Sequence, residues 1–165
     1  MARPDVADFL REVQLFRAFS DADRDAVARA LRERKLRKGQ VLFRQGEPGE
    51  EMFLVRRGAI VVSKTVTPPV EQVLARFGPG DFFGEMSLFD HAPRSATIQA
   101  EADTELLVLD RASLQALIDA DPRAAASFFH ALVQVFIDRL RAAGDLVAEV
   151  TRWRLEATGL DVEGR

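Results

Sequence analysis

The chain has 165 residues, of which 47% are hydrophobic and 30% are charged, with a formal net charge of −3 and no cysteine. This length favours one domain, residues 1–165, with a single sizeable core. The lack of cysteine excludes disulfides, thiolate metal ligands and thiol nucleophiles, and it favours a reducing compartment, so we expect a cytoplasmic protein. The near-neutral charge gives no general attraction for nucleic acid, and no apolar run is long enough to span a membrane.

The first part of the chain has apolar residues at the spacing of a helix. Ser20 and Asp23 form a candidate N-cap before the segment "DADRDAVARALRER". Together with the apolar spacing, this cap predicts two short helices within residues 1–36. The spacing is carried by Phe9, Val13, Phe16, Val27 and Leu31.

The middle of the chain, residues 37–110, has the period of two that is typical of strands. Glycine- and proline-rich separators, "QGEPGEE", "RRG" and "TVTPPVEQ", divide it, and "ATIQA" and "TELLVLD" add two strands near its end. Many short strands at near-regular spacing predict a mainly β fold, an antiparallel sandwich or barrel. The first alternating pairs are Val41 and Phe43, Phe53 and Val55, and Ile60 and Val62.

The last part of the chain, residues 111–158, is predicted to be helical. Asp110 can cap one helix, and Asp121 with Pro122 can start a second helix of more than thirty residues that tolerates Gly144. The apolar residues of this long helix recur close to a heptad spacing, so we expect part of the stripe to cover the β-unit and part to meet a second chain. They are Phe129, Leu132, Phe136, Leu140, Ala143, Val147 and Val150.

The segment "FFGEMSLFDHAPRSAT", residues 82–97, has a composition suited to a sugar phosphate. Gly84 permits close backbone approach, and a short helix starting at Glu85 would turn free N–H groups toward an anion. Arg94 offers a planar fork for phosphate oxygens, and Pro93 restricts the loop before it. Glu85 would accept hydrogen bonds from neutral hydroxyls, such as those of a ribose. In the alternative interpretation, Glu85 and Arg94 form an ion pair with each other that only stabilises the loop.

Several motifs together resemble the cyclic nucleotide-binding domains of the catabolite activator protein, the regulatory subunits of cyclic AMP-dependent protein kinase and the cyclic nucleotide-gated channels. "RKGQVLFRQGEPGEEMFLVRRGAIVVSK" resembles the first strands of that family. "GPGDFFGEMSLFDHAPRSATI" resembles its phosphate-binding cassette, and "TELLVLDRASLQALI" the strand and helix that follow. The resemblance covers roughly residues 10–145 and implies an eight-stranded antiparallel β-roll with N-terminal helices and a long C-terminal helix.

The resemblance also implies roles for single residues. It assigns the Gly84 backbone and Glu85 to the ribose 2′-hydroxyl, and Arg94 and Ser95 to the cyclic phosphate. Other family positions that line or support the pocket fall on Phe82, Phe83, Met86, Ser87, Leu88, Ala96 and Thr97.

The sequence says less about whether the cyclic nucleotide carries adenine or guanine. The residue after the cassette arginine is often threonine in cyclic GMP-selective members, and the shorter hydroxyl of Ser95 also suits cyclic AMP binders, so we expect cyclic AMP ahead of cyclic GMP. Ala143 and Gly144 stand where the catabolite activator protein has a Thr-Ser pair that reads the adenine. Arg139 or Arg141 could contact the base from the same helix.

We therefore expect a regulatory module that binds a cyclic nucleotide, needs no cofactor or metal, and signals through its C-terminal helix to an unknown protein effector or a homodimer. Only "TGLDVEGR" follows Ala157, too short for a helix-turn-helix, so direct DNA binding is not expected, nor is a membrane partner. The alternative is a nucleotide-independent interaction protein that keeps the β-roll, with Trp153 and the helix stripe as its surface.

An enzyme is the third reading. His91 and His130 have no metal-ligand or catalytic-triad spacing, so no enzyme is expected, and we place both at the surface. The basic run "RERKLRK", residues 32–38, is read as a solvated face rather than a nucleic-acid or membrane contact.

Overall fold

The computed structural model describes residues 3–157, beginning with α1 (Pro4–Glu12), the 3₁₀ turn η1 (Gln14–Phe16) and α2 (Asp21–Ala30). The Ser20 side chain accepts a hydrogen bond from the Asp23 N–H at 3.1 Å, which confirms the predicted N-cap. Val13 has an extended backbone, with φ −77° and ψ 124°, so the apolar stripe from Phe9 to Phe16 is divided between a helix and a 3₁₀ turn.

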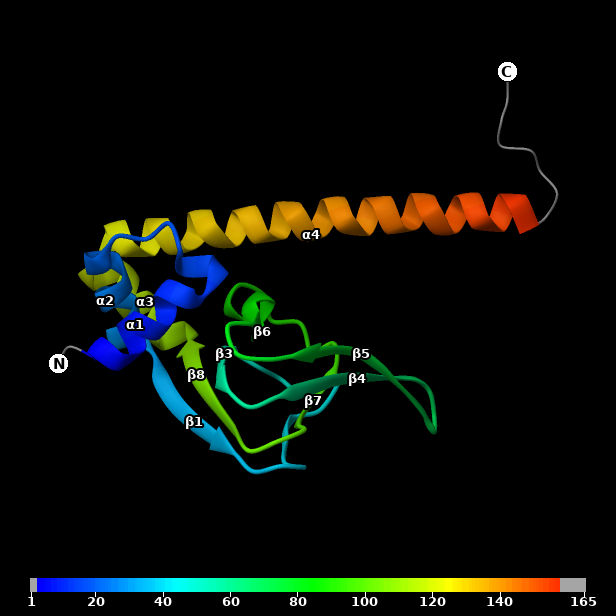
Figure 1. The fold of residues 1–165 in the computed structure, drawn as a ribbon, viewed down its shortest axis with the longest axis horizontal. Coiled ribbons are helices and arrows are strands. Elements are labelled where there is room, and N and C mark those ends of the chain that lie inside the picture. The colour runs from blue at the N-terminus through cyan, green and yellow to red at the C-terminus, as the bar shows by residue number, and fades with distance from the viewer. Residues whose placement is uncertain (1–2, 158–165) are drawn as a thin grey trace, which may run out of the picture. The chain divides into compact units, whose positions relative to one another are not determined.

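Eight strands form two four-stranded sheets, ordered β1-β8-β3-β6 and β2-β7-β4-β5 (Figure 1). Every strand pair is antiparallel, which confirms the predicted eight-stranded β-roll. The strands are β1 (Arg32–Leu36), β2 (Val41–Phe43), β3 (Glu51–Arg57), β4 (Ile60–Thr67), β5 (Val70–Phe77), β6 (Phe82–Phe83), β7 (Thr97–Ala100) and β8 (Thr104–Asp110).

Strand β1 was not predicted, because the helical region was expected to extend to residue 36. Four of its five residues, Arg32 to Lys35, are charged and exposed, and only Leu36 is buried. The ladder to β8 holds this segment in the sheet, with Arg32 opposite Val108 and Leu36 opposite Thr104. The charged side chains leave no apolar alternation that could reveal a strand. The basic run is exposed at these four positions, as expected.

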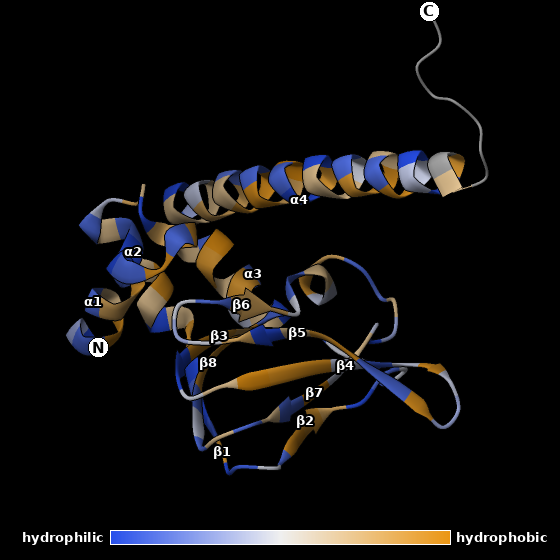
Figure 2. Ribbon diagram, turned by 45° about the vertical axis from the view of Figure 1, so that its right-hand side comes forward, coloured by the Kyte–Doolittle hydropathy of each residue, from blue (hydrophilic) through white to orange (hydrophobic). Residues whose placement is uncertain are grey.

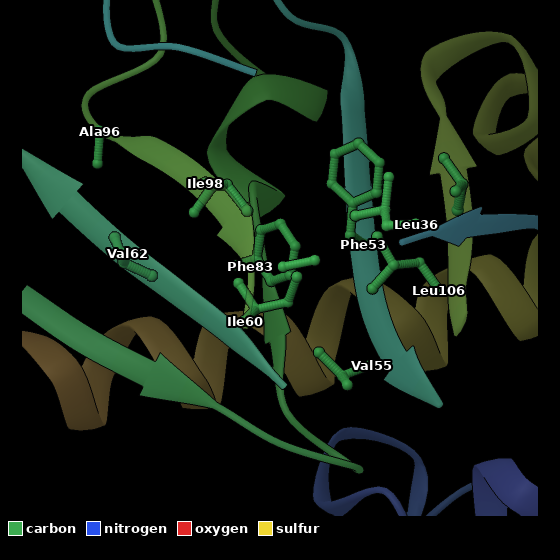
Figure 3. Close-up of a cluster of buried hydrophobic side chains, with 11 residues drawn as sticks. Leu36, Phe53, Val55, Ile60, Val62, Phe83, Ala96, Ile98 and Leu106 are labelled. Carbon is green, nitrogen blue, oxygen red and sulfur yellow. The ribbon is translucent and has the colours of Figure 1, made fainter. Parts of the chain in front are cut away.

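The interior of the roll is a continuous apolar cluster (Figure 3). Phe53 of β3 and Phe83 of β6 stack with ring centroids 5.3 Å apart, and Phe77 stacks on Phe83 from β5. Strands β3 and β8 lie inside their sheet and bury both faces, since η2 (Glu85–Leu88) contacts β3, and α3 (Arg111–Ala120) contacts β8. Strands buried on both faces read as unbroken apolar runs, as in "MFLV" and "LLVL".

Helix α3 is followed by α4 (Pro122–Ala157). Both predicted caps are confirmed: Asp110 accepts from the Ser113 N–H at 2.7 Å, and Asp121 accepts from the Ala124 N–H at 3.0 Å. The chain divides into two compact units after Ser127, so most of α4 belongs to the second unit.

Apolar and polar residues alternate along α4 (Figure 2). Within the predicted stripe, Leu132 is buried, whereas Leu140, Val147 and Val150 are exposed. Trp153 is 71% exposed, so it is not a packing residue within the described chain. Residue 158, the expected end of the helical region, and the tail "TGLDVEGR" lie outside the described residues.

Candidate functional site

The predicted cassette follows the short strand β6. Gly84 has φ +76°, in the left-handed region that glycine adopts without strain, and one 3₁₀ turn, η2, begins at Glu85 as predicted. A Cβ atom on Gly84 would lie 2.9 Å from the Glu51 carbonyl oxygen and 2.9 Å from Nη1 of Arg94. Glycine is therefore required here for both backbone conformation and space. Because η2 has only four residues, its dipole is small, and the site depends mainly on side chains.

Arg94 is 5% exposed and points into the protein. Its Nη1 donates to the Glu51 carbonyl oxygen at 3.0 Å and to the Ser87 hydroxyl at 2.9 Å. Its guanidinium carbon lies 4.1 Å from the centre of the Phe43 ring, a cation–π contact. The Nε of Arg94 is buried and has no hydrogen-bond partner among the described residues. A buried cation with an unsatisfied donor is the arrangement expected at an anion site.

Two backbone hydrogen bonds also hold Arg94 in position. The Arg94 N–H donates to the Glu47 carbonyl at 2.8 Å, and the Arg94 carbonyl accepts from the Gly46 N–H at 2.8 Å. Burial lowers the pKa of the Arg94 guanidinium from its usual value, and the Glu51 carboxylate partly offsets this. The guanidinium still carries its charge at neutral pH, because arginine titrates far above that range. A bound anion would offset the cost of burying that charge.

Glu85 and Ser87 are two buried residues of η2 that carry oxygen acceptors. Glu85 is 4% exposed and Ser87 is also buried, and both lie on the 3₁₀ turn. Gly84, which starts this turn, lies against Arg94. A donor fork and a carboxylate are therefore buried within one short segment around a glycine. This combination can bind a ligand that has an anionic group and neutral hydroxyls.

The remaining predicted residues have different environments. Phe83 and Ala96 are buried in the core cluster of the roll, whereas Ser95 is exposed at the loop end and Met86 is 62% exposed. Arg139 lies on α4 in the second unit with an exposed side chain. The structure thus brings Gly84, Ser87 and Arg94 into contact, with Glu85 on the same turn. Of the supporting positions, Phe82 and Thr97 are half-buried and Leu88 is buried.

The sequence reasoning missed several residues of this site. Gly49 was assigned only to a turn, yet a Cβ atom there would lie 2.0 Å from Nε of Arg94. Phe43 and Glu51 were assigned only to strands or turns, although both contact Arg94. The glycine-rich spacing of "QGEPGEE" was the available signal, since a glycine outside a left-handed position often marks close approach by another group.

The described residues contain neither a cluster of metal ligands nor a membrane-spanning helix. In the part of the chain that the structure describes, no group of three or more histidine, cysteine, aspartate or glutamate side chains is arranged to hold a metal ion. Across residues 3–157, no helix combines the length and apolar character needed to cross a membrane. His91 and His130 are both exposed, as expected.

Comparison with known proteins agrees with this geometry. A family model described as the cyclic nucleotide-binding domain matches residues 33–121, and the chain belongs to this family. It is 41% identical over 128 residues to a cyclic nucleotide-gated potassium channel of Mesorhizobium japonicum, covering 73% of this chain and 34% of the channel. It is 37% identical over 129 residues to the cyclic AMP receptor protein of Thermus thermophilus, covering 78% of this chain and 58% of that protein.

Solved structures show the same fold. The catabolite activator protein of Thermus thermophilus matches with a TM-score of 0.74 and 35% identity, over 83% of this chain and 62% of that one. A cyclic nucleotide-binding domain from Methylobacillus flagellatus matches with a TM-score of 0.75 and 26% identity, over 88% of this chain and 82% of that one. The chain spans 34% and 58% of the length of the two curated relatives described above, so it corresponds to one region of each.

Proposed function

We propose that this chain binds a cyclic nucleotide at the cassette around Gly84 and acts as a regulatory module rather than an enzyme. In this proposal the Gly84 backbone and Glu85 hold the ribose 2′-hydroxyl, and Arg94 with Ser95 holds the cyclic phosphate. The supporting positions are Phe83, Met86, Ser87 and Ala96. The observation that carries the proposal is the buried Arg94 guanidinium, whose Nε lacks a partner among the described residues while a buried carboxylate, Glu85, lies on the adjoining turn.

Cyclic AMP is the proposed ligand, ahead of cyclic GMP. A serine after the cassette arginine offers a short hydroxyl at Ser95, which suits an adenine nucleotide as well as a guanine one. Similarity to a protein named cyclic AMP receptor protein supports the same order. Arg139 is the proposed base contact on α4. No cofactor is proposed beyond the nucleotide itself.

In this proposal, the C-terminal helix transmits nucleotide binding to a protein effector or across a homodimer. A ligand can shift α4 only if it binds two arrangements of the helix with different affinity. The exposed apolar residues Leu140, Val147 and Val150 support a second chain as the partner of α4. The cysteine-free composition supports a cytoplasmic site of action, and the proposal includes neither DNA nor membrane as a partner.

Isothermal titration of the full chain with cyclic AMP, cyclic GMP and adenosine tests the proposed binding. We expect cyclic AMP to bind most tightly and cyclic GMP more weakly. Adenosine, which has the base and ribose without a phosphate, should not bind measurably, because it leaves the donors of Arg94 unsatisfied. Absence of binding by both cyclic nucleotides at high micromolar concentration would overturn the proposal.

The second candidate is a nucleotide-independent dimerisation protein, and the exposed stripe on α4 is the observation that favours it. Sedimentation with and without cyclic AMP separates the two candidates. A dimer that forms equally in both conditions, in a protein that binds no nucleotide, supports the second candidate. A nucleotide-dependent change supports the first.

A further inference from the structure

Arg111, the first residue of α3, reaches back from the end of β8 to the cassette. Its Nε donates to the Ser87 carbonyl at 2.9 Å, and its Nη2 donates to the Asp90 carbonyl. Its Nη1 lies 2.7 Å from Nδ1 of His91. One side chain therefore holds three successive points of the segment that connects η2 to the loop before Arg94.

The acceptors of Arg111 lie next to those of Arg94. Ser87 gives its carbonyl to Arg111, and its hydroxyl accepts from Arg94 Nη1 at 2.9 Å. At the start of β3, the Arg111 backbone N–H donates to the Glu50 carbonyl at 3.2 Å, and Arg94 Nη1 donates to the Glu51 carbonyl at 3.0 Å. Both arginines thus use the same serine and two consecutive residues, Glu50 just before β3 and Glu51 at its start. A shift of Arg111 would therefore move the groups that orient Arg94.

We propose that Arg111 is a positioning residue that holds the cassette in its ligand-binding arrangement and joins it to α3. The inference rests on the proposed function and deepens it, because it adds a positioning residue to the same site. Arg111 acts through Ser87 and Arg94 and does not itself contact the ligand in this scheme.

Arg111→Gln and Arg111→Lys test the positioning role at neutral pH. Glutamine keeps a donor without charge, and lysine keeps the charge without the fork. We expect both variants to weaken cyclic AMP binding, by about tenfold or more for glutamine, because several charge-assisted bonds to the cassette are lost. The thermal unfolding midpoint of each variant identifies a misfolded one. A folded variant of either kind with wild-type affinity contradicts the proposal.

Amide hydrogen exchange of nucleotide-free protein separates this inference from the proposed function. Arg111→Gln should speed exchange in residues 85–91. If wild type binds no nucleotide, the proposed function fails and the effect on affinity fails with it. The exchange data still decide whether Arg111 holds the segment, and unchanged exchange would show that it does not.

Discussion

Gly49 lies directly over the guanidinium of Arg94: a Cβ atom on Gly49 would stand 2.0 Å from Nε and 2.3 Å from Cζ of that arginine. Gly49 has no left-handed backbone that would require glycine, so the close approach alone explains the residue. The absence of one methyl group thus leaves room for the buried guanidinium that we assign to the cyclic phosphate.

Gly49→Ala should therefore weaken cyclic AMP binding without unfolding the protein. The methyl group must displace the end of the Arg94 side chain, which is flexible in itself but is held by Ser87, Glu51 and Phe43. We expect a loss of about tenfold to a hundredfold in affinity, measured by isothermal titration.

The control for this substitution is Gly78→Ala. Gly78 also lacks a left-handed backbone, and a Cβ atom there would meet nothing within 4 Å. This variant should bind cyclic AMP like wild type. Equal affinity in both alanine variants would show that the space under Gly49 does not matter for the ligand.

Substitution of Arg94 tests the phosphate assignment directly. Arg94→Ala removes the guanidinium donors to the anion, so we expect affinity to fall by about a hundredfold or more, since each charge-assisted hydrogen bond contributes about 1.5–3 kcal/mol. Arg94→Lys keeps the charge but not the planar fork, so its affinity should lie between those of alanine and wild type. Titration at neutral pH measures all three proteins, and a lysine variant no better than alanine would favour geometry over charge.

Much of the fold was predictable, because apolar residues alternate where one strand face is buried and run continuously where both faces are. Strands β2 to β4, β7 and β8 were recognised in this way. The sequence could not reveal β1, whose exposed residues are charged, because its pairing to β8 depends on backbone hydrogen bonds that leave no side-chain pattern. The predicted turn "TVTPPVEQ" was too long, because β4 continues to Thr67 and β5 begins at Val70, but the strand expected at "VEQVLARF" is confirmed as β5.

The candidate site was predictable where its residues are neighbours in sequence. Gly84, Glu85 and Arg94 fall in one short segment whose composition already indicates an anion and a sugar. Gly49 and Arg111 belong to the same site only because the roll brings distant segments together. No local pattern records such contacts, and a helix-starting arginine such as Arg111 is read as an exposed charge until its partners are seen.

The assignment of Glu85 to the ribose predicts a specific coupling. Glu85→Ala should weaken cyclic AMP binding by about tenfold, because a buried hydrogen-bond acceptor for the 2′-hydroxyl is lost. With 2′-deoxy cyclic AMP, wild type should lose a similar factor, and Glu85→Ala should lose little more. Titration of both proteins with both ligands gives the coupling free energy. Additive losses would show that Glu85 and the 2′-hydroxyl do not contact each other.

Asp110 should make stability depend on pH in the acid range. Its pKa is lowered from the usual value of 3.8, first because its carboxylate accepts from the Ser113 N–H, with a further contribution from Arg32 at 3.0 Å, while burial acts in the opposite direction. A carboxylate with a lowered folded-state pKa stabilises the protein above its unfolded pKa, and this stabilisation is lost as pH falls through the folded value.

Asp110→Asn keeps a capping oxygen but removes the charge. We expect this variant to be less stable than wild type at neutral pH by a few tenths to about 1 kcal/mol, and the difference to shrink as pH falls below about 4. Urea unfolding at several pH values measures it. Asp145→Asn is the control, since Asp145 is exposed on α4, and a pH-independent deficit in Asp110→Asn would contradict the charge-based explanation.

The exposed stripe of α4 predicts self-association through this helix. Val133, Leu140 and Val147 recur every seven residues, with Phe136 and Ala143 between them and Val150 three residues further on, which is the spacing of a coiled-coil seam. Val147→Glu places a charge in that seam, whereas Ala148→Glu places the same charge on the neighbouring exposed position outside it. Glutamate is a good helix former, so neither variant should disrupt the helix. Sedimentation velocity should show dimers for wild type and Ala148→Glu but mainly monomers for Val147→Glu, and a monomeric wild type would exclude the seam as a dimer contact.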